Sequence, residues 1–329
     1  MSPQDNPNGS LVGPAQGGVS VVVPSYNHQG FVQTTLRSIF NQTLSPQELL
    51  VIDDGSNDNS PKIIRDALRE CPVPFEFIAR SNRGLCATLN EGLAKTSGKF
   101  FAYLSSDDVW LPEFLEARVS TLEAKPQAVL AFGHCYLINS QNEIIDSTRD
   151  WANYASDDPR AMLLKQTFAP MSPTVVYRRA AVEKEGWDEQ AKLEDYDLYL
   201  RLSTEGDFAF DPRVLSAWRY HGLNTSGDFS WMIEARLAAQ RRVASRIGLS
   251  PNELAQYQRV LTFAGAEDLC RLGKKAEAIR LFRTGLRGAP SMLARMRLVA
   301  RLLEPGVMLK WRRKHKQKQA TERYGALII

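Results

Sequence analysis

The chain has 329 residues, of which 43% are hydrophobic and 24% charged, and its net charge is +4. This composition is typical of a globular protein with about two domains, and it excludes a disordered, collagen-like or disulfide-framework protein. The charge is unevenly distributed: residues 1–228 carry 20 Lys and Arg against 30 Asp and Glu, whereas residues 229–329 carry 21 against 7. The sequence therefore predicts two regions, of net charge −10 and +14, with different tasks.

The cellular location is predicted from the lack of a membrane-spanning or secretory pattern and from the spacing of the cysteines. No stretch approaches the roughly 18 consecutive apolar residues of a membrane-spanning helix, and the N-terminus lacks a charged-then-apolar secretory pattern. Because the four cysteines include no C-x-x-C pair, we expect neither a zinc site nor a redox pair. These observations predict a cytoplasmic protein in a reducing compartment.

The first half of the chain alternates between short apolar runs and amphipathic segments. Residues 1–17, rich in Pro, Gly, Asn and Ser, are expected to form a flexible arm. Strands are then predicted at 19–23, 49–53, 75–79 and 100–104, with helices at about 31–40, 60–68, 84–96 and 112–124. This alternation predicts a mainly parallel sheet with helices on both faces.

The pattern then changes twice. Residues 128–138 and the pair at 144–145 predict an antiparallel hairpin, which extends an α/β domain covering residues 18–228. From 229 to 329 the sequence has a helical period, interrupted around 248–251, 273, 288–290 and 305–306. Within this basic helical region, residues 263–290 resemble a single tetratricopeptide-type helix pair, which we expect to pack on its neighbours because one copy cannot form a solenoid.

Acidic side chains follow two strands of the predicted sheet. Ligands of open parallel sheets bind beyond the carboxyl ends of the strands, and there Asp53-Asp54 and Asp107-Asp108 emerge. The sequence has neither G-x-G-x-x-G after its first strand nor G-x-x-x-x-G-K-[ST] anywhere. Turn and helix-cap roles are the ordinary alternative for each pair. Two converging pairs favour a site for Mg²⁺ or Mn²⁺ that would in turn bind a diphosphate.

A family resemblance extends this interpretation. The segments VSVVVPSYN, VIDDGSND, NRGLCATLNEGL, SGKFFAYLSSDD and KLEDYDLYLRL occur within residues 18–226. Their order and approximate spacing resemble family 2 glycosyltransferases with the GT-A fold. The resemblance implies a Rossmann-like, mixed, mainly parallel sheet. It also implies inverting transfer of a sugar from a nucleotide diphosphate sugar to an acceptor hydroxyl.

The resemblance also implies roles for individual residues. Tyr26 would stack on the base, with Pro24 main chain and Asn27 nearby, and Asp54 would accept a hydrogen bond from the base. Asp107 would approach the ribose or the metal, and Asp108 would coordinate the metal.

The acidic run at 194–197 takes the position of the general base. The resemblance assigns the base to Asp195, with Glu194 as the rival, Asp197 as a supporting residue and Arg201 at the family's usual Arg position. The alternative for Asp195 is a charge on a solvated helix face. His221, in an H-x-x-N-x-S segment, is a candidate contact for phosphate or metal, although a lone His is often structural.

Two positions depart from the family pattern. Many relatives carry D-x-D-D where this chain has Ser105-Ser106-Asp107-Asp108, so metal coordination is predicted to depend mainly on Asp108 and the diphosphate. Many relatives also have an Arg before the Asn of the third motif, and this chain has Leu89-Asn90 there. Arg83 is expected to supply a nearby positive charge instead.

The end of the chain combines an apolar stripe with dense positive charge. Residues 292–303 place several apolar side chains on one helical face, and KWRRKHKQK at 310–318 has six Lys and Arg and no acid. This pattern, across residues 291–323, favours a helix at an anionic membrane surface. A packed helix followed by a solvated charge run, or nucleic-acid binding, are the alternatives, but nothing else in the chain resembles a nucleic-acid module.

The sequence thus predicts a metal-dependent, inverting glycosyltransferase that is cytoplasmic and peripheral at the inner face of the cell membrane. Mn²⁺ or Mg²⁺ is the expected cofactor, and a glycan or lipid-linked acceptor in bacterial surface polysaccharide or lipopolysaccharide synthesis is the expected partner. The predicted donor is a UDP-sugar, because a carboxylate can accept the N3–H of uracil, with dTDP and GDP open. The alternatives are a sugar-phosphate nucleotidyltransferase and a non-catalytic sugar-nucleotide-binding or scaffold protein.

Overall fold

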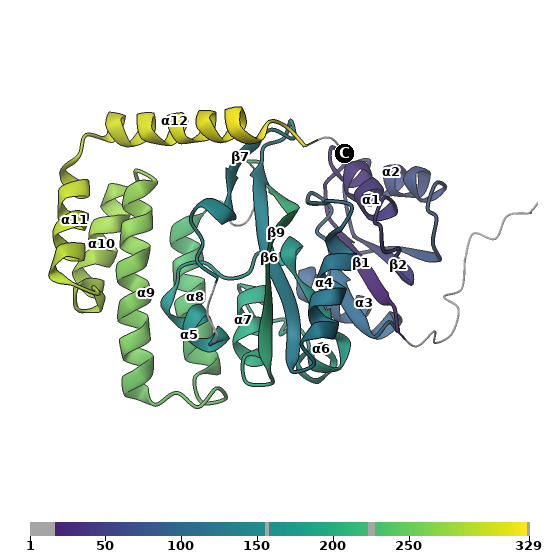
Figure 1. Ribbon diagram of the computed structural model, residues 1–329, viewed down its shortest axis with the longest axis horizontal. Helices are drawn as coiled ribbons and strands as arrows, with labels where there is room; N and C mark the ends of the chain where they lie inside the picture. The colour runs from purple at the N-terminus through teal and green to yellow at the C-terminus, as the bar shows by residue number, and fades with distance from the viewer. Residues whose placement is uncertain (1–16, 155–157, 223–227, 328–329) are drawn as a thin grey trace, which may run out of the picture.

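The computed structural model describes residues 17–154, 158–222 and 228–327. The predicted N-terminal arm therefore lies outside the described residues except for Gly17. Within the described ranges, a mixed sheet with helices on both faces is followed by a group of helices at one side of the molecule (Figure 1). The α/β prediction is confirmed, together with the helical C-terminal region.

The described strands form one nine-stranded sheet with the order β3-β2-β1-β4-β8-β6-β9-β5, and β7 pairs with β6. Its first four strands are parallel, as predicted, whereas β8 and β5 run antiparallel to their neighbours. The predicted hairpin is the antiparallel pair β6–β7. The bounds are β1 Val19–Ser25, β2 Glu48–Asp54, β3 Phe75–Arg80, β4 Phe100–Tyr103, β5 Val109–Trp110, β6 Ala128–Ile138, β7 Ile144–Ser147, β8 Val176–Arg178 and β9 Asp207–Arg219.

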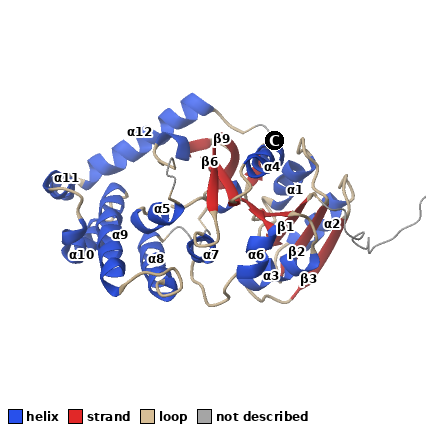
Figure 2. Ribbon diagram, turned by 60° about the horizontal axis from the view of Figure 1, so that its bottom comes forward, coloured by secondary structure: helices blue, strands red, loops and turns tan. Residues whose placement is uncertain are grey.

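The helices of the first two-thirds of the chain cover both faces of this sheet (Figure 2). Since successive side chains of a strand point to opposite faces, Val21 and Val23 of β1 pack with α1, α2 and α4, whereas Val22 packs with α3, α6 and α7. The bounds are α1 Val32–Phe40, α2 Ser60–Leu68, α3 Leu85–Lys95, α4 Phe114–Ala124, α5 Pro159–Lys165, α6 Arg179–Glu185 and α7 Glu194–Leu202, with 3-10 turns at Thr148–Asp150 and Ser172–Thr174.

The helices beyond residue 228 begin and end where the sequence predicts. A capping box of Ser250 and Glu253 starts α9, and Gly273 with φ +80° separates α9 from α10. The predicted tetratricopeptide-type pair, residues 263–290, falls on the end of α9, on α10 and on the 3-10 turn after it, and its likeness to that repeat stays a prediction. The bounds are α8 Phe229–Val243, α9 Pro251–Arg271, α10 Lys275–Gly285, α11 Met292–Leu303 and α12 Gly306–Tyr324, with a 3-10 turn at Leu286–Gly288.

The packing of these helices refines the division at residue 228, which stays a prediction. Ala239 and Val243 of α8 belong to the same core as α3 and α7. A separate core joins Ile233 of α8 to residues of α9, α10 and α11, among them Phe263 and Leu298. Helix α8 therefore connects the sheet region, residues 18–228, to the helical region, residues 229–329.

The last helix returns to the sheet. In Figure 1, α12 runs from α11 across one side of the molecule to β7. Thr321 donates to the Ile144 carbonyl at 2.9 Å, and Glu143 pairs with Ala326 in an antiparallel bridge. None of the helices among the described residues has the length and apolar character that crossing a bilayer requires.

Candidate active site

The loops after β1 and β2 are joined to each other by hydrogen bonds. Asn27 adopts φ +56°, a left-handed conformation that Asn tolerates better than most residues. Its backbone N–H donates to Ser56 Oγ at 2.9 Å, and its side-chain oxygen accepts from Asn57 N at 2.8 Å. His28 N donates to Ser60 Oγ at 3.0 Å. The structure thus gives the predicted nucleotide-binding residue Asn27 a bracing role between the two loops.

Tyr26 and Pro24 differ in their access to solvent. Pro24 is buried within β1 beside Ile52, so only its position next to the loop relates it to a ligand. Tyr26 is 46% exposed, which is unusual for a large aromatic side chain beside a core strand. An exposed ring here is available for stacking.

Asp54 holds the loop before α3. Its two carboxylate oxygens accept the backbone N–H groups of Arg83 and Gly84, each at 2.8 Å, and Oδ1 also pairs with the Arg80 guanidinium. A carboxylate offers about four acceptor positions, so one more donor can be accepted. The Arg83 side chain is exposed and pairs with Glu91 at 3.3 Å. Only the backbone of Arg83 therefore contacts Asp54.

One group of side chains has the character of a metal site. His28, Asp107 and His221 each offer a ligand atom, and these atoms lie within 4.8 Å of one another. Asp107 Oδ2 is 2.9 Å from His221 Nε2, and Oδ1 is 3.8 Å from His28 Nδ1. Burial lowers the pKa of His28, which favours the neutral imidazole that a metal requires. The His221 ring stacks on Phe31 with centroids 5.1 Å apart.

Asp108 forms hydrogen bonds with other parts of the protein and is not one of the three residues of this cluster. Its Oδ1 accepts the backbone N–H of Arg219 at 2.8 Å, and its carbonyl accepts from Thr35 Oγ1 at 2.8 Å. Burial and the charge of Asp107 raise the pKa of Asp108. The Arg219 side chain donates to the Asp107 carbonyl at 2.7 Å. Of the two predicted metal ligands, Asp107 thus lies in the cluster with the histidines, whereas Asp108 has one carboxylate oxygen bonded to the β9 backbone, and its role at a metal stays a prediction.

The predicted base lies at the start of α7. Glu194 and Asp195 are half-buried in the first turn of this helix. Burial and the neighbouring Asp195 charge raise the pKa of Glu194 to about 8. Burial also raises the pKa of Asp195, and the Arg236 charge opposes that rise. A carboxylate with a raised pKa is a stronger base near neutral pH.

The two candidate general bases lie near the end of β4. Burial raises the pKa of Tyr103, the last residue of β4, and the charges of Tyr177, Glu194 and Asp195 raise it further. The same Glu194 charge adds to the burial that raises the pKa of Cys86 to about 12. Glu194 and Asp195 therefore lie within electrostatic reach of the strand that leads to Asp107.

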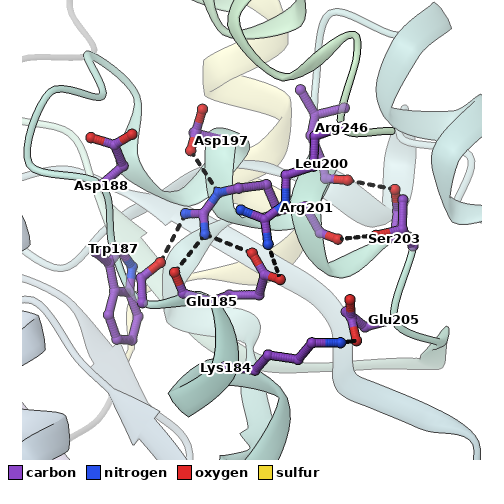
Figure 3. Close-up of polar contacts among 12 residues, drawn as sticks. Lys184, Glu185, Trp187, Asp188, Asp197, Leu200, Arg201, Ser203, Glu205 and Arg246 are labelled. Atoms are coloured by element: carbon purple, nitrogen blue, oxygen red, sulfur yellow. Dashed lines mark hydrogen bonds and ion pairs between the residues drawn. The ribbon is translucent and has the colours of Figure 1, made fainter. Parts of the chain in front are cut away.

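A buried network fixes the helix that carries these carboxylates (Figure 3). Arg201 Nε donates to Asp197 at 3.0 Å, and Arg201 Nη1 donates to Glu185 at 2.9 Å. Arg242 of α8 pairs with Asp197, and Arg246 pairs with Glu185. The predicted supporting roles of Asp197 and Arg201 are thus structural: they connect α7 to the end of α6 and to α8.

Sequence reasoning missed three residues of this region. His28 immediately follows the S-Y-N motif at the carboxyl end of β1, which was the available indication. Arg80 faces Asp54 in the parallel register of β2 and β3. Arg219 stands two residues before His221. The predicted segment after His221 falls on residues 223–227, which lie outside the described residues.

Sequence comparisons relate the chain to glycosyltransferases. Residues 20–186 match the profile of glycosyl transferase family 2. An uncharacterised glycosyltransferase of Haemophilus influenzae is 30% identical over 228 residues, 64% of this chain and 68% of its own. One of Nostoc sp. is 29% identical over 50% of this chain and 52% of its own, and Escherichia coli chondroitin synthase is 25% identical over 63% and 30%. The chain thus spans about half of the Nostoc protein and about a third of the chondroitin synthase.

Solved structures show the same fold at low identity. S. aureus TarS 1-349, solved in complex with UDP-GlcNAc, superposes with a TM-score of 0.57 at 14% identity, over 95% of this chain and 93% of that chain. A mannosyltransferase of Pyrobaculum calidifontis, solved with GDP-Man and Mn²⁺, gives 0.57 at 16% identity over 94% and 88%. With the motifs, the sheet order and the family match, they show that the chain belongs to glycosyl transferase family 2 and has the GT-A fold.

Proposed function

We propose that the protein is an inverting glycosyltransferase that moves a sugar from a nucleoside diphosphate sugar, with UDP favoured, to an acceptor hydroxyl. One observation carries this proposal: a group of possible metal ligands follows β4, and a carboxylate pair of raised pKa lies within electrostatic reach of the end of the same strand. Glycosyl transfer from a diphosphate needs both, because the leaving group must be neutralised and the acceptor deprotonated.

The nucleotide is expected at the loops after β1 and β2. The exposed ring of Tyr26 would stack on the base, with Asn27 beside it, and Asp54 has an acceptor position left for a base N–H. Uracil offers such a donor at N3, and so does thymine. The TarS complex, which contains UDP-GlcNAc, is consistent with a uridine nucleotide.

Asp107 and His221 are the proposed metal ligands, with His28 beside them. The donor set fits a divalent ion, because it combines a carboxylate with imidazole nitrogens. It favours Mn²⁺ over Mg²⁺, which prefers all-oxygen ligands. A bound Mn²⁺ would supply Lewis-acid neutralisation of the departing diphosphate. Asp108 would support the site from behind by fixing Arg219, which holds the Asp107 backbone.

Asp195 is the proposed general base, with Glu194 as the rival for that role, and burial raises the pKa of both carboxyls. The acceptor hydroxyl would give its proton to Asp195 while its oxygen forms a bond to the anomeric carbon. The bond from that carbon to the phosphate oxygen would break, and the nucleoside diphosphate would leave with the electron pair. Attack opposite the leaving group inverts the configuration in one step, without a covalent intermediate of the enzyme.

The acceptor is proposed to be a glycan, free or lipid-linked, in bacterial surface polysaccharide or lipopolysaccharide synthesis. The relatedness to a chondroitin synthase supports a polysaccharide product. Family membership favours glycosyl transfer over the sugar-phosphate nucleotidyltransferase and the non-catalytic binding protein.

Calorimetry with UDP-, dTDP-, GDP- and CMP-sugars, with and without Mn²⁺, tests the proposal. We expect the tightest binding for a UDP-sugar with Mn²⁺, and we expect an Asp107→Ala variant to lose the metal-dependent part. Hydrolysis of the bound donor without acceptor, measured on the same samples, would distinguish an enzyme from a binding protein. Metal-independent binding, or a preference for CMP-sugars, would overturn the mechanism.

A further inference from the structure

The two helices that precede the C-terminus expose a continuous row of apolar side chains. The row recurs every three or four residues, so its members share one face of α11 and then of α12. Their exposed fractions range from 43% at Val299 to 80% at Leu303. We call this row the apolar stripe: Met292, Met296, Val299, Leu303, Val307 and Trp311.

The stripe is not the face by which α11 packs on the protein. Leu298, which lies between members of the stripe in sequence, is fully buried in the core shared with α9 and α10. Helix α11 thus carries apolar side chains on two faces, and one of them has no cover among the described residues. Contiguous exposed apolar surface of this kind marks an interaction site.

The most exposed part of the stripe is a corner. Leu303 and Val307 are 80% and 78% exposed and lie on either side of Pro305-Gly306, where α11 meets α12. Figure 1 shows this corner at the outer edge of the molecule, away from the sheet. Apolar side chains this exposed, at an outer corner of the molecule, suit insertion into a soft layer better than the docking of a peptide in a groove.

Unneutralised positive charge surrounds the corner. Within the described part of the chain, no ion pair involves Lys310, Arg313 or Lys314, all of which are exposed. Residues 291–323 contain ten Lys and Arg and two acidic residues. Their partner must therefore accept apolar side chains and also carry negative charge.

Both helices are fixed to the rest of the protein. Lys275 donates to the carbonyls of Leu302 and Glu304 at the end of α11. Near its other end α12 pairs through Lys316 with Asp146 at 2.9 Å, and Tyr324 donates to Asp150 at 2.9 Å. The corner is thus presented on a preformed support, so little ordering cost accompanies binding.

We propose that the corner of α11 and α12 inserts Leu303, Val307 and Trp311 into the interface of an anionic lipid bilayer, with the cations of α12 on the headgroups. Interfacial helices bind through apolar area together with electrostatic attraction, and both are present here. A second copy fits less well, since a two-fold contact at the corner would bring its cations together. Nucleic acid would leave the apolar stripe exposed.

The end of α12 opposite the corner is connected to the candidate active site by hydrogen bonds. Leu327, just beyond α12, donates to the Asn142 carbonyl at 2.9 Å. Asn142 Oδ1 accepts from Arg219 at 2.7 Å, and Arg219 holds the Asp107 carbonyl. Helix α12 thus begins at the corner, where the bilayer would bind, and ends next to the candidate active site. The membrane proposal itself does not depend on the reaction.

Co-sedimentation of the full chain with vesicles tests the proposal. We expect binding to vesicles of phosphatidylcholine with phosphatidylglycerol, and little binding to phosphatidylcholine alone. The corner variant Leu303→Ser, Val307→Ser and the charge variant Lys310→Glu, Arg313→Glu, Lys314→Glu should each weaken binding by about tenfold or more. Because the altered side chains are exposed, the thermal midpoint of unfolding should stay within experimental error of that of the parent protein.

A matched control carries the same change in net charge on the sheet region: Lys62→Glu, Arg69→Glu, Lys125→Glu, all at exposed positions. It should retain vesicle binding. Equal loss in this control, or unchanged binding in the corner and charge variants, would overturn the proposal. Two further results, each in a protein that does not bind anionic vesicles, would also overturn the proposal. One is a dimer in sedimentation that the corner variant dissociates, and the other is binding to a DNA duplex.

Discussion

The sheet region and the helical region use charge in opposite ways. In the sheet region, charged side chains are buried and paired: Arg118 with Asp211 at 2.8 Å, and Arg201 with Asp197 and Glu185. Near the end of the helical region, cations lie on the surface, and apolar side chains are exposed beside them. Buried ion pairs of this kind can hold the carboxylates of a site in position. Surface cations, in contrast, can contact a large anionic partner.

The strongest test of the sheet region is removal of the proposed base. Asp195→Asn should lower the rate of sugar transfer by about 10²–10⁴-fold while donor binding changes little, because general-base catalysis contributes about that much. The measurement is steady-state kinetics together with donor calorimetry. Glu189→Gln, at an exposed position in the loop before α7, is the matched control. Equal activity of the two variants would refute the assignment.

Buried and exposed ion pairs should differ in their contribution to stability. Arg201→Met removes the buried one of the two arginines that pair with each of Asp197 and Glu185, and should cost about 3–5 kcal/mol of unfolding free energy. Arg271→Met, which breaks an exposed pair with Asp268 in the helical region, should cost at most about 1 kcal/mol. Denaturant unfolding of both variants measures the difference. Similar costs would contradict the comparison between the regions.

The two acids after β4 should separate in their effect on metal binding. Asp107→Asn should weaken Mn²⁺ binding by more than about tenfold, because a proposed ligand is lost. Asp108→Asn retains an oxygen that can accept the Arg219 N–H, so its effect should be smaller. Titration of Mn²⁺ followed by electron paramagnetic resonance measures both affinities. A larger loss for Asp108→Asn would restore the assignment made from sequence.

The carboxylate pair predicts a pH dependence. The transfer rate should rise with pH, because burial raises the pKa of both Asp195 and Glu194, that of Glu194 to about 8, and only an ionised carboxylate can accept the proton of the acceptor. Glu194→Gln removes the neighbouring charge, so the rising limb of the rate should move to lower pH. The same raised pKa means that the folded protein loses stability as pH rises from the ordinary carboxyl range towards 8, and the variant should lose less. A limb that does not move would exclude coupling.

The smallest effect is expected at the start of α9. Ser250→Ala removes the two hydrogen bonds of the Ser250 hydroxyl with Glu253, keeps the bond from the backbone N–H of residue 250 to the Glu253 carboxylate, and should cost about 1 kcal/mol of unfolding free energy. Following unfolding by circular dichroism and by tryptophan fluorescence would show whether the two regions unfold together. Because α8 belongs to both cores, we expect a single transition, and a separate early loss of helix would contradict that.

The local order of elements was predictable because local chemistry decides it. The alternation of short apolar runs and helical periods placed β1 to β4 and α1 to α4 within a few residues, and Gly273 and Pro305 marked helix breaks that the structure confirms. The resemblance to the family gave the fold, because its motifs lie at strand ends. The same motifs make Asp54 and Asp195 predictable as site residues from the sequence.

The partners of these residues could not be predicted, since they come from distant parts of the chain. His28, Asp107 and His221 meet only when β1, β4 and the end of β9 converge. Asp108 has a different environment from Asp107 because the β9 backbone supplies the N–H of Arg219. Asp107 and Asp108, adjacent in the sequence, thus differ in their contacts because of β9, a strand that follows about a hundred residues later.

By itself the sequence determined the two oppositely charged regions, the alternating sheet and helix pattern, and the carboxylates at strand ends. Those depend on residue type and spacing along the chain. Only the tertiary structure decided which carboxylate faces the histidines, how the Arg201 network fixes α7, and which apolar side chains of α11 stay exposed. These depend on long-range packing, because the burial and hydrogen bonding of a side chain are set by elements that its own neighbours in sequence do not specify.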